Sequence, residues 1–397
     1  MPRRSNKAGR RPDLLPFARP DMTEAEVEAV AAVLRSGWLT TGPRVKEFEE
    51  AFARTVGARH AIALASGTAA LHAAYSILGL GPGDEVVTTP MTFVSTVAMI
   101  EAVGATPVFA DIDPASLNIA PSAVQAAVNE RTGAIVPVHF AGLPCEVDAV
   151  RGIAQRRDIP VVEDAAHALG ASCRGRAVGS LADITIFSFH PAKNITTGEG
   201  GMLTTNCQPL ASAARTFNFH GLLREPSDPF TPLPYDVQSV GYKYNMTDIQ
   251  AALGLAQLGR LKEMNQKRAD VASLYLSLLA EVEELTLPPL PREGVVHAWH
   301  LFIIRLKPER VTIDREGFRT ELSARNIATG FHYPAVHELS YYREKYRLRA
   351  KDFPAASRAG HTVVSLPLFP AMTEEDVADV VRAVKDVLRR HRRPKAT

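Results

Sequence analysis

One lysine stands in a setting that suits carbonyl chemistry. Lys193 lies in the segment SFHPAKNITTGEGG, which directly follows the apolar run ITIF at residues 184–187. Ligands of open α/β sheets bind beyond the C-terminal ends of strands, so a lysine placed there reaches a ligand. An amine partly shielded from water has a lowered pKa and can attack a carbonyl to form a Schiff base. A surface lysine on a connecting loop is the competing interpretation.

An acidic pair ends the preceding apolar run, PVVEDAAHALG. A carboxylate at the end of a buried strand costs free energy unless a cation faces it, so Asp164 is expected to meet a positive partner. In pyridoxal-phosphate enzymes, the protonated pyridine nitrogen is such a partner, and the carboxylate keeps the ring able to withdraw electrons. The alternative is that Asp164 caps a helix beginning with AAHAL.

Upstream, the segment ALASGTAALHAAYSIL turns from an apolar run through Ser66, Gly67 and Thr68 directly into a helix pattern. Unpaired N–H groups at a helix start bind phosphate, and glycine lets a ligand approach the backbone. Phe93, in PMTFVST, supplies an aromatic ring that could stack on a cofactor. An ordinary helix cap and a core phenylalanine are the alternatives. A phosphate site, an aromatic residue, an acid and a lysine in this order indicate a pyridoxal-phosphate site more specifically than any one of these features alone.

The elements that must position these residues follow a βαβ pattern. Between residues 61 and 206, short apolar runs alternate with helix-like stretches, which predicts an α/β fold with a mostly parallel sheet. A proline-rich loop at residues 220–244 is followed by a helix that Thr247 would cap and that would continue toward Leu279. The predicted parts are a basic disordered tail (residues 1–15), a large cofactor domain (16–260), a small C-terminal α+β domain that begins with the bridging helix (261–388) and a second basic tail (389–397).

Composition excludes several classes of protein. The 397 residues suffice for one large domain and a smaller one, and 45 Lys and Arg balance 43 Asp and Glu. A net charge of +2 gives no reason to expect a nucleic acid or a membrane surface as partner. Three cysteines without a CxxC pair argue against a zinc site and a disulfide framework, so a reducing cytoplasm is expected. No run long enough to span a membrane occurs, and G-x-G-x-x-G and Walker motifs are absent.

The ordered motifs resemble the DegT-type, vitamin-B6-dependent sugar aminotransferases from about Pro16 to Leu388. The segments that carry the resemblance include GWLTTGPRVKEFEEAFA, SGTAAL, GDEVVTTPMTFVST, VEDAAHALG, SFHPAKNITTGEGG and GYKYNMTDIQAALGLAQL. The resemblance implies an aspartate-aminotransferase-like fold, which is fold type I of the pyridoxal-phosphate enzymes. It also implies pyridoxal 5′-phosphate as cofactor, no metal, and homodimers whose active sites lie at the subunit interface.

Residue roles follow from the same resemblance. Lys193 would bind the cofactor covalently, Asp164 would pair with the pyridine nitrogen, and His167 would lie near the ring hydroxyl. The residues expected to hold the phosphate within one subunit are Gly67, Thr68 and Ser188, while Phe93 would cover a ring face. Lys243 and Asn245 would reach the phosphate of the neighbouring subunit's cofactor. Substrate contacts are expected from Thr41, His332 and Tyr333, with Thr40 and His337 as further candidates.

The implied reaction is ping-pong transfer of an amino group from L-glutamate to a keto group, expected at C4, of a nucleotide-diphosphate sugar. GYKYN, HAWHLFII and TGFHYPAVH are most similar to the branch that makes UDP-4-amino-4-deoxy-L-arabinose for lipopolysaccharide. Phe93 and Pro191 depart from that branch and match other sugar C4-aminotransferases, so the sugar stays open. The alternatives are a sugar dehydratase that uses pyridoxamine phosphate, with His in place of the lysine, and a non-catalytic cofactor-binding regulatory protein.

Overall fold

The structure is a computed structural model that describes residues 10–223 and 235–394. The predicted tail arginines Arg3 and Arg4 lie outside these residues, as does the proline-rich decapeptide at 225–234.

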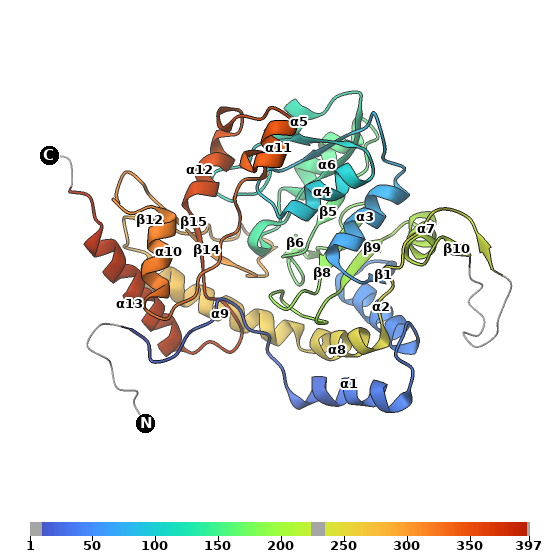
Figure 1. Ribbon diagram of the computed structural model, residues 1–397, viewed down its shortest axis with the longest axis horizontal. Coiled ribbons are helices and arrows are strands. Elements are labelled where there is room, and N and C mark those ends of the chain that lie inside the picture. The colour runs from blue at the N-terminus through green and yellow to red at the C-terminus, as the bar shows by residue number, and fades with distance from the viewer. Residues whose placement is uncertain (1–9, 224–234, 395–397) are drawn as a thin grey trace.

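A mostly parallel sheet forms the centre of the molecule (Figure 1). Four strands pair in the order β1-β9-β8-β5, and three more pair as β3-β2-β4. Parallel bridges between Ile135 and Val161 and between Val138 and Asp164 join β4 to β5, so the two groups form one layer. Among the described strands of this layer, β9 alone runs antiparallel to its neighbours. The strands are His60–Leu64 (β1), Glu85–Thr88 (β2), Thr106–Phe109 (β3), Thr132–Val136 (β4), Val162–Asp164 (β5), Ile184–Ser188 (β8) and Gly201–Thr205 (β9).

Helices cover this sheet, as the uninterrupted apolar character of its strands predicts. Apolar side chains of β1, β5, β8 and β9 are buried between them. Ser66 caps α3, and its side chain accepts a hydrogen bond from the Ala69 N–H at 3.0 Å. The covering helices are Pro43–Val56 (α2), Gly67–Ile77 (α3), Val94–Ala102 (α4), Pro121–Ala127 (α5), Val147–Gln155 (α6) and Gln208–Asn218 (α7).

The long helix expected after Thr247 is two helices. A capping box between Thr247 and Gln250 starts α8, Asp248–Gly259, and α9 follows as Leu261–Leu279. The break falls at Arg260, whose guanidinium forms ion pairs with Asp21 and Glu26 at 2.6 and 3.0 Å. Glu26 lies in the first turn of α1, Glu24–Ser36, and Asp21 lies just before this helix, which packs along α8. Helix α9 then crosses to the side where α10 and α13 lie (Figure 1).

The C-terminal part has its own antiparallel sheet, in the order β12-β14-β15, and its own apolar core with α9 and α13. Its elements are Leu285–Thr286 (β12), Phe302–Leu306 (β14), Arg315–Ser323 (α10), Ser340–Lys345 (α11), Pro354–Thr362 (α12), Val363–Leu366 (β15) and Glu374–Arg390 (α13). Two small sheets of two-residue strands complete the fold. One consists of Ser172–Cys173 (β6), Arg176–Ala177 (β7) and Val295–Val296 (β13), and the other consists of Leu222–Leu223 (β10) and Asp236–Val237 (β11). Three-residue 3-10 helices are Phe140–Gly142, Val336–Glu338 and Ala350–Asp352.

The two basic segments predicted as tails, the first of them as disordered, pack against the C-terminal part in their described residues. Arg11 is buried and forms ion pairs with Asp376 and Asp379, both at 2.6 Å. Leu15 is buried as well and bridges to Ile327 in a short parallel pairing. At the other end, α13 continues to Arg390, and the segment beyond it pairs with Val311. Charge pairing and backbone pairing thus anchor both segments to the C-terminal part.

Among the described helices, none is both long enough and apolar enough to cross a lipid bilayer.

Candidate active site

A cavity of 380 Å³ lies at the C-terminal ends of β5 and β8, beside the start of α3. This is the location at which open α/β sheets bind ligands. Most of the residues predicted from the sequence line it together: Gly67, Thr68, Phe93, Asp164, His167, Ser188, Lys193, His332 and Tyr333. Segments far apart in the chain therefore meet at one site.

Lys193 is presented to the cavity by a loop that is fastened on both sides. The Asn194 side chain donates hydrogen bonds to the Ala298 carbonyl at 2.8 Å and to the Asn265 side chain at 2.7 Å. Thr196 donates to the Phe189 carbonyl at 2.9 Å. Burial lowers the pKa of Lys193 to about 8, although the Asp164 carboxylate opposes this effect. The amine is therefore much more often neutral, and nucleophilic, than that of an exposed lysine.

Asp164 is held rigidly at the end of β5. One carboxylate oxygen accepts the Thr96 hydroxyl at 2.7 Å, and the other accepts the Ala166 N–H at 3.1 Å. Thr92 is hydrogen-bonded to Thr96 at 2.8 Å, which orients the Thr96 hydroxyl. Burial raises the pKa of Asp164, while these hydrogen bonds and Lys193 lower it. Turns follow Asp164 instead of a helix, so the helix-cap interpretation is wrong.

His167 forms one wall of the cavity. Its Nε2 atom is hydrogen-bonded to the Tyr333 hydroxyl at 2.9 Å, and its ring packs against His300 with the centroids 4.4 Å apart. Burial lowers the pKa of His167 well below its ordinary value, so the ring is neutral. Its Nδ1 atom is buried and has no hydrogen-bond partner among the described residues. A polar group of a bound ligand would satisfy this atom.

The start of α3 lies close against β8 and β9. A Cβ atom on Gly67 would lie 3.0 Å from Ser188 Cβ, and one on Gly201 would lie 2.3 Å from the Ser66 carbonyl oxygen. Glycine at both positions thus lets the two strand ends and the helix start meet. The first N–H groups of a helix have no partners within it, and with the positive end of the dipole they favour an anion.

Nearly the whole chain is similar to a known protein family. A family model described as the DegT/DnrJ/EryC1/StrS aminotransferase family matches residues 20–385. The chain belongs to this family. The spore coat polysaccharide biosynthesis protein SpsC of Bacillus subtilis (strain 168) is 43% identical over 384 residues, which cover 96% of this chain and 98% of that protein.

Solved structures agree with this assignment. A putative sugar aminotransferase of Streptococcus pneumoniae, Spr1654 in its PMP form, aligns with a TM-score of 0.89 at 33% identity, covering 95% of this chain and 99% of that one. Helicobacter pylori PseC, an aminotransferase involved in pseudoaminic acid biosynthesis, aligns with a TM-score of 0.89 at 31% identity, over 95% and 100% of the two chains. The predictions of an aspartate-aminotransferase-like fold and of an aminotransferase are confirmed.

Members of this family bind pyridoxal phosphate, and structures of Spr1654 with it and with its amino form are known. The cavity of this DegT-family chain fits that group. It combines a helix start suited to the phosphate, a buried carboxylate suited to the ring nitrogen, and an amine with a lowered pKa. The unpartnered His167 Nδ1 is available for a polar substituent of the ring.

The wall of the cavity that carries the candidate substrate contacts His332 and Tyr333 also contains residues that sequence reasoning missed. Phe17 lines it and stacks on His332 with the centroids 5.2 Å apart. His332 is hydrogen-bonded to Ser365 at 2.8 Å, and Phe93 packs against Tyr333 at 5.9 Å. His300 belongs to HAWH, a segment that carried the resemblance without receiving a role. Nothing in the sequence around Phe17 indicates that it reaches the site.

Three predicted site residues lie outside this cavity, at the edge of a second cavity of 770 Å³ or beside it. Thr41 and Asn245 line that cavity, and the Asn245 amide donates to the Thr41 hydroxyl at 2.7 Å. The Lys243 ammonium donates to the side-chain amide oxygen of Asn245 and lies 4.3 Å from the Phe219 ring centroid. The structure therefore groups Thr41, Lys243 and Asn245 with one another and not with Lys193. The candidate His337 is buried elsewhere and is hydrogen-bonded to Ser357. The Thr40 carbonyl accepts a hydrogen bond from the Asp248 N–H at the start of α8.

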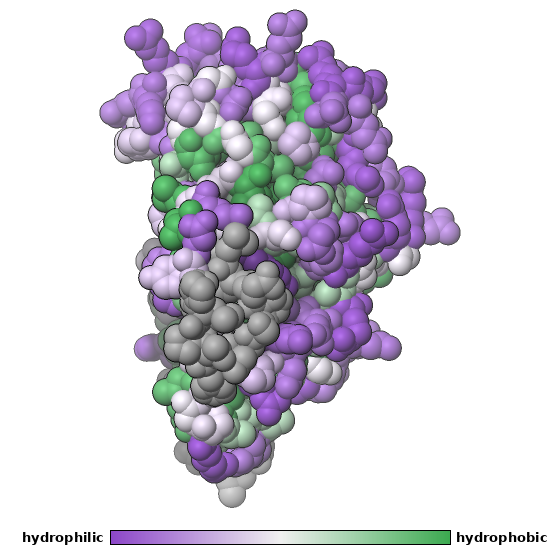
Figure 2. Space-filling model, turned by 90° about the vertical axis from the view of Figure 1, so that its right-hand side faces the viewer, coloured by the Kyte–Doolittle hydropathy of each residue, from purple (hydrophilic) through white to green (hydrophobic). Residues whose placement is uncertain are grey.

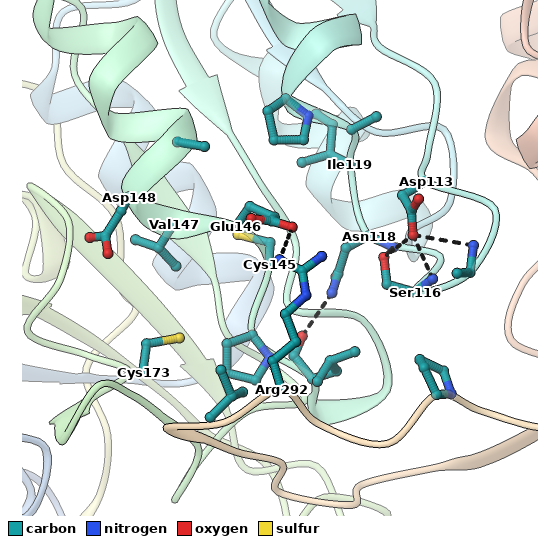
Figure 3. A pocket seen from close by; sticks show the side chains of 18 of the residues that line it. Asp113, Ser116, Asn118, Ile119, Cys145, Glu146, Val147, Asp148, Cys173 and Arg292 are labelled. Carbon is teal, nitrogen blue, oxygen red and sulfur yellow. Dashed lines mark hydrogen bonds and ion pairs between the residues drawn. The ribbon is translucent and has the colours of Figure 1, made fainter.

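A third cavity, of 550 Å³, contains none of the predicted residues (Figure 3). Cys145 and Cys173 line it beside the ion pairs of Glu146 with Arg292 and of Asp148 with Arg174. Within residues 10–223 and 235–394, no group of three His, Cys, Asp or Glu side chains is arranged to hold a metal ion.

Proposed function

We propose that this DegT-family enzyme transfers an amino group from L-glutamate to the keto group, at C4, of a nucleotide-diphosphate sugar. The observation that carries the proposal is the amine of Lys193, whose pKa is lowered to about 8, in the same cavity as the buried carboxylate of Asp164. The roles of SpsC in spore coat polysaccharide biosynthesis and of PseC in pseudoaminic acid biosynthesis support a sugar as acceptor and polysaccharide or lipopolysaccharide biosynthesis as the setting.

Each side chain has a part in the proposed mechanism. Bound pyridoxal phosphate supplies a ring that withdraws electrons from the α-carbon of the amino donor. Asp164 would keep a positive charge at the ring nitrogen, and the Thr96 hydroxyl, which donates a hydrogen bond to it, orients its carboxylate. Lys193 would hold the cofactor. Its freed Nζ atom would then move one proton in each half-reaction, first from the α-carbon of glutamate to the cofactor and later from the cofactor to the sugar carbon. His167 would bind a polar substituent of the ring, Phe93 would pack against the ring, and Gly67, Thr68 and Ser188 would hold the phosphate.

Lysine at position 193 favours transamination over the alternatives. The dehydratase branch carries His in place of this residue, whereas this chain has Lys193. A regulatory protein that only binds the cofactor has no need for a base that moves a proton. The loop that holds Lys193 beside Asp164 therefore supports a catalyst.

We also propose that two subunits share each site. Among the described residues that line the cavity around Lys193, none supplies a second lysine or an arginine near the helix start, whereas Lys243 and Asn245 lie together at a surface of the same chain. On the face that carries α7 and β10, apolar side chains gather among hydrophilic ones (Figure 2). Val237, in the strand β11 that pairs with β10, is 56% exposed, and Val240 is 82% exposed. A second copy that covers this surface would bring Lys243 and Asn245 to the partner's phosphate, and Thr41 to its sugar.

The sugar would enter past His332 and Tyr333, which line the cavity beside Phe93. A substrate of the UDP-4-amino-4-deoxy-L-arabinose pathway is one specific form of the proposal, and other 4-keto sugars compete with it because Phe93 and Pro191 are shared with their enzymes. The cytoplasm is the proposed compartment, since none of the three cysteines forms a disulfide.

A substrate panel tests the proposed reaction. Purified enzyme loaded with pyridoxal phosphate is incubated with glutamate and with UDP-, GDP- and dTDP-linked 4-keto sugars, while 2-oxoglutarate and the product mass are measured. We expect stoichiometric 2-oxoglutarate and an amino sugar with at least one acceptor, and neither product with Lys193→Ala. Glutamate turnover without any aminated sugar across the panel would overturn the sugar assignment.

Complementation tests the shared site. Lys193→Ala and Asn245→Ala subunits, each weakly active alone, are mixed under conditions that exchange subunits. One site of each hybrid then combines an intact Lys193 with an intact Asn245 from the other chain, so we expect activity to rise toward about a quarter of the wild-type value. Subunit exchange is verified by mass spectrometry of differently tagged chains. Verified hybrids without any gain in activity would contradict the shared site.

A further inference from the structure

An aromatic cluster joins helix α3 to the segment GYKYN at residues 241–245. The His72 ring on α3 lies 4.8 Å from the Tyr242 centroid and 5.4 Å from that of Phe217. Tyr242 and Tyr244 stack on each other at 5.1 Å. None of these side chains lines the cavity around Lys193. The proposed reaction gives the cluster no role.

A single hydrogen bond fastens GYKYN to the helix at the centre of this cluster. His72 Nδ1 and the Tyr244 hydroxyl are 3.1 Å apart. Burial lowers the pKa of His72 and raises that of Tyr244, so both partners are neutral near pH 7. The His72 side chain is only 7% exposed, so loss of either partner would leave a polar atom poorly solvated.

The backbone of GYKYN is extended, so the hydrogen bond at Tyr244 also fixes the direction of the neighbouring side chains. Residue 245 bridges to Leu64 and residue 243 to Phe219, and the Tyr244 carbonyl accepts the Ala65 N–H at 2.6 Å. Side chains of an extended strand alternate between two faces. When Tyr244 points at α3, Lys243 and Asn245 therefore point to the other face. There Asn245 reaches Thr41, and Lys243 lies over Phe219.

Helix α3 serves two sites in this arrangement. It begins at Gly67 and Thr68, which line the cavity around Lys193 of the same chain. Little more than one turn later, His72 fixes the segment that presents Lys243 and Asn245 outward. In a dimer with shared sites, those two residues belong to the partner's phosphate.

We propose that His72 is a positioning residue that acts across the dimer: through Tyr244 it holds Asn245 and Lys243 in place for the cofactor phosphate of the neighbouring subunit. The inference rests on the shared site proposed above. It implies that a change at His72 weakens cofactor binding in the partner's site and leaves its own site intact.

The first test measures cofactor affinity. Apo enzyme is titrated with pyridoxal phosphate, and the visible absorbance of the bound cofactor is recorded. We expect His72→Ala to raise the dissociation constant about tenfold, because Asn245 would no longer be held in place for its hydrogen bond to the charged phosphate. Tyr244→Phe removes the same hydrogen bond and keeps the ring, so it should shift the constant in the same direction. Circular dichroism establishes that both variants are folded, and an unchanged constant in folded variants overturns the proposal.

Hybrid dimers decide in which site His72 acts. In the first hybrid, the His72→Ala chain keeps Lys193, and its partner carries Lys193→Ala. In the second, one chain carries both substitutions, and its partner is native. Each hybrid has a single site with Lys193, so the visible absorbance reports that site alone. We expect native affinity in the first hybrid and the tenfold loss in the second.

Other patterns overturn the proposal. A loss in the first hybrid alone would mean that His72 supports the helix start of its own chain, and equal losses would mean a general effect on the fold. The same two hybrids built with Asn245→Ala test the shared site separately. If Asn245→Ala weakens the site of its own chain, the dimer proposal fails. If Asn245→Ala acts across the dimer and His72→Ala does not, only the positioning role of His72 fails.

Discussion

Pyridoxal phosphate should react with Lys193 of the apo enzyme at a rate that rises through a midpoint near pH 8. Only a neutral amine attacks the aldehyde, and burial lowers the pKa of Lys193 to about 8 from the ordinary 10.5. The increase in visible absorbance after rapid mixing gives the rate at each pH. N-acetyl-lysine, mixed with pyridoxal phosphate in parallel, shows the profile of an exposed amine.

Lys193→Ala should have the largest effect of any substitution in the chain. It removes both the covalent attachment and the base that moves the proton, and a positioned base alone contributes about 10²- to 10⁴-fold. We expect at least a thousandfold loss of turnover and release of the cofactor on gel filtration. Lys262→Ala, an exposed lysine on α9, is the matched control and should behave as wild type. Retained turnover in Lys193→Ala, or a midpoint for cofactor uptake near that of N-acetyl-lysine, would show that another group is the nucleophile.

Sequence reasoning located the centre of this site because its residues follow the strand ends of a parallel sheet. Asp164 and Ser188 end β5 and β8, Lys193 follows β8, and Gly67 opens the helix after β1. Residues of these types next to short apolar runs form local patterns that can be recognised in the sequence. The sheet then brings them together, because parallel strands end at the same edge.

The residues that were missed reach the cavity by long-range packing. Phe17 belongs to a segment anchored on the C-terminal part by Arg11 and Leu15, and a basic, proline-containing stretch does not reveal such an anchor. The break between α8 and α9 has the same kind of cause, since the partners of Arg260 lie more than two hundred residues earlier in the chain. Ion pairs between distant segments leave no periodic signal in the sequence.

Asp164→Asn should separate cofactor binding from catalysis. Asparagine has nearly the same shape but no charge, so it no longer favours a proton on the ring nitrogen. We expect the variant to bind pyridoxal phosphate at Lys193 and to lose about 10²- to 10³-fold in turnover, the size seen when one electrostatic partner of a reacting group is removed. Asp111→Asn is the control, because the Asp111 carboxylate also accepts backbone N–H groups, those of Ala355 and Ala356, outside the cavity. Turnover of Asp164→Asn within threefold of wild type would remove Asp164 from the mechanism.

The same substitution should stabilise the apo protein above pH 4. Burial raises the pKa of Asp164 in the folded state above its ordinary 3.8. The folded chain then binds more protons than the unfolded chain at this group, so its contribution to stability falls as pH rises above that value. Asparagine has no ionised form, so it avoids the loss of stability that comes from burying a charged carboxylate. We expect apo Asp164→Asn to unfold at a higher temperature than apo wild type at pH 8, and the difference to disappear near pH 4.

A variant less stable than wild type at pH 8 would mean that Lys193 already offsets the cost of the buried carboxylate without the cofactor. If stability rises while turnover falls, the charge at position 164 is retained for catalysis and not for the fold.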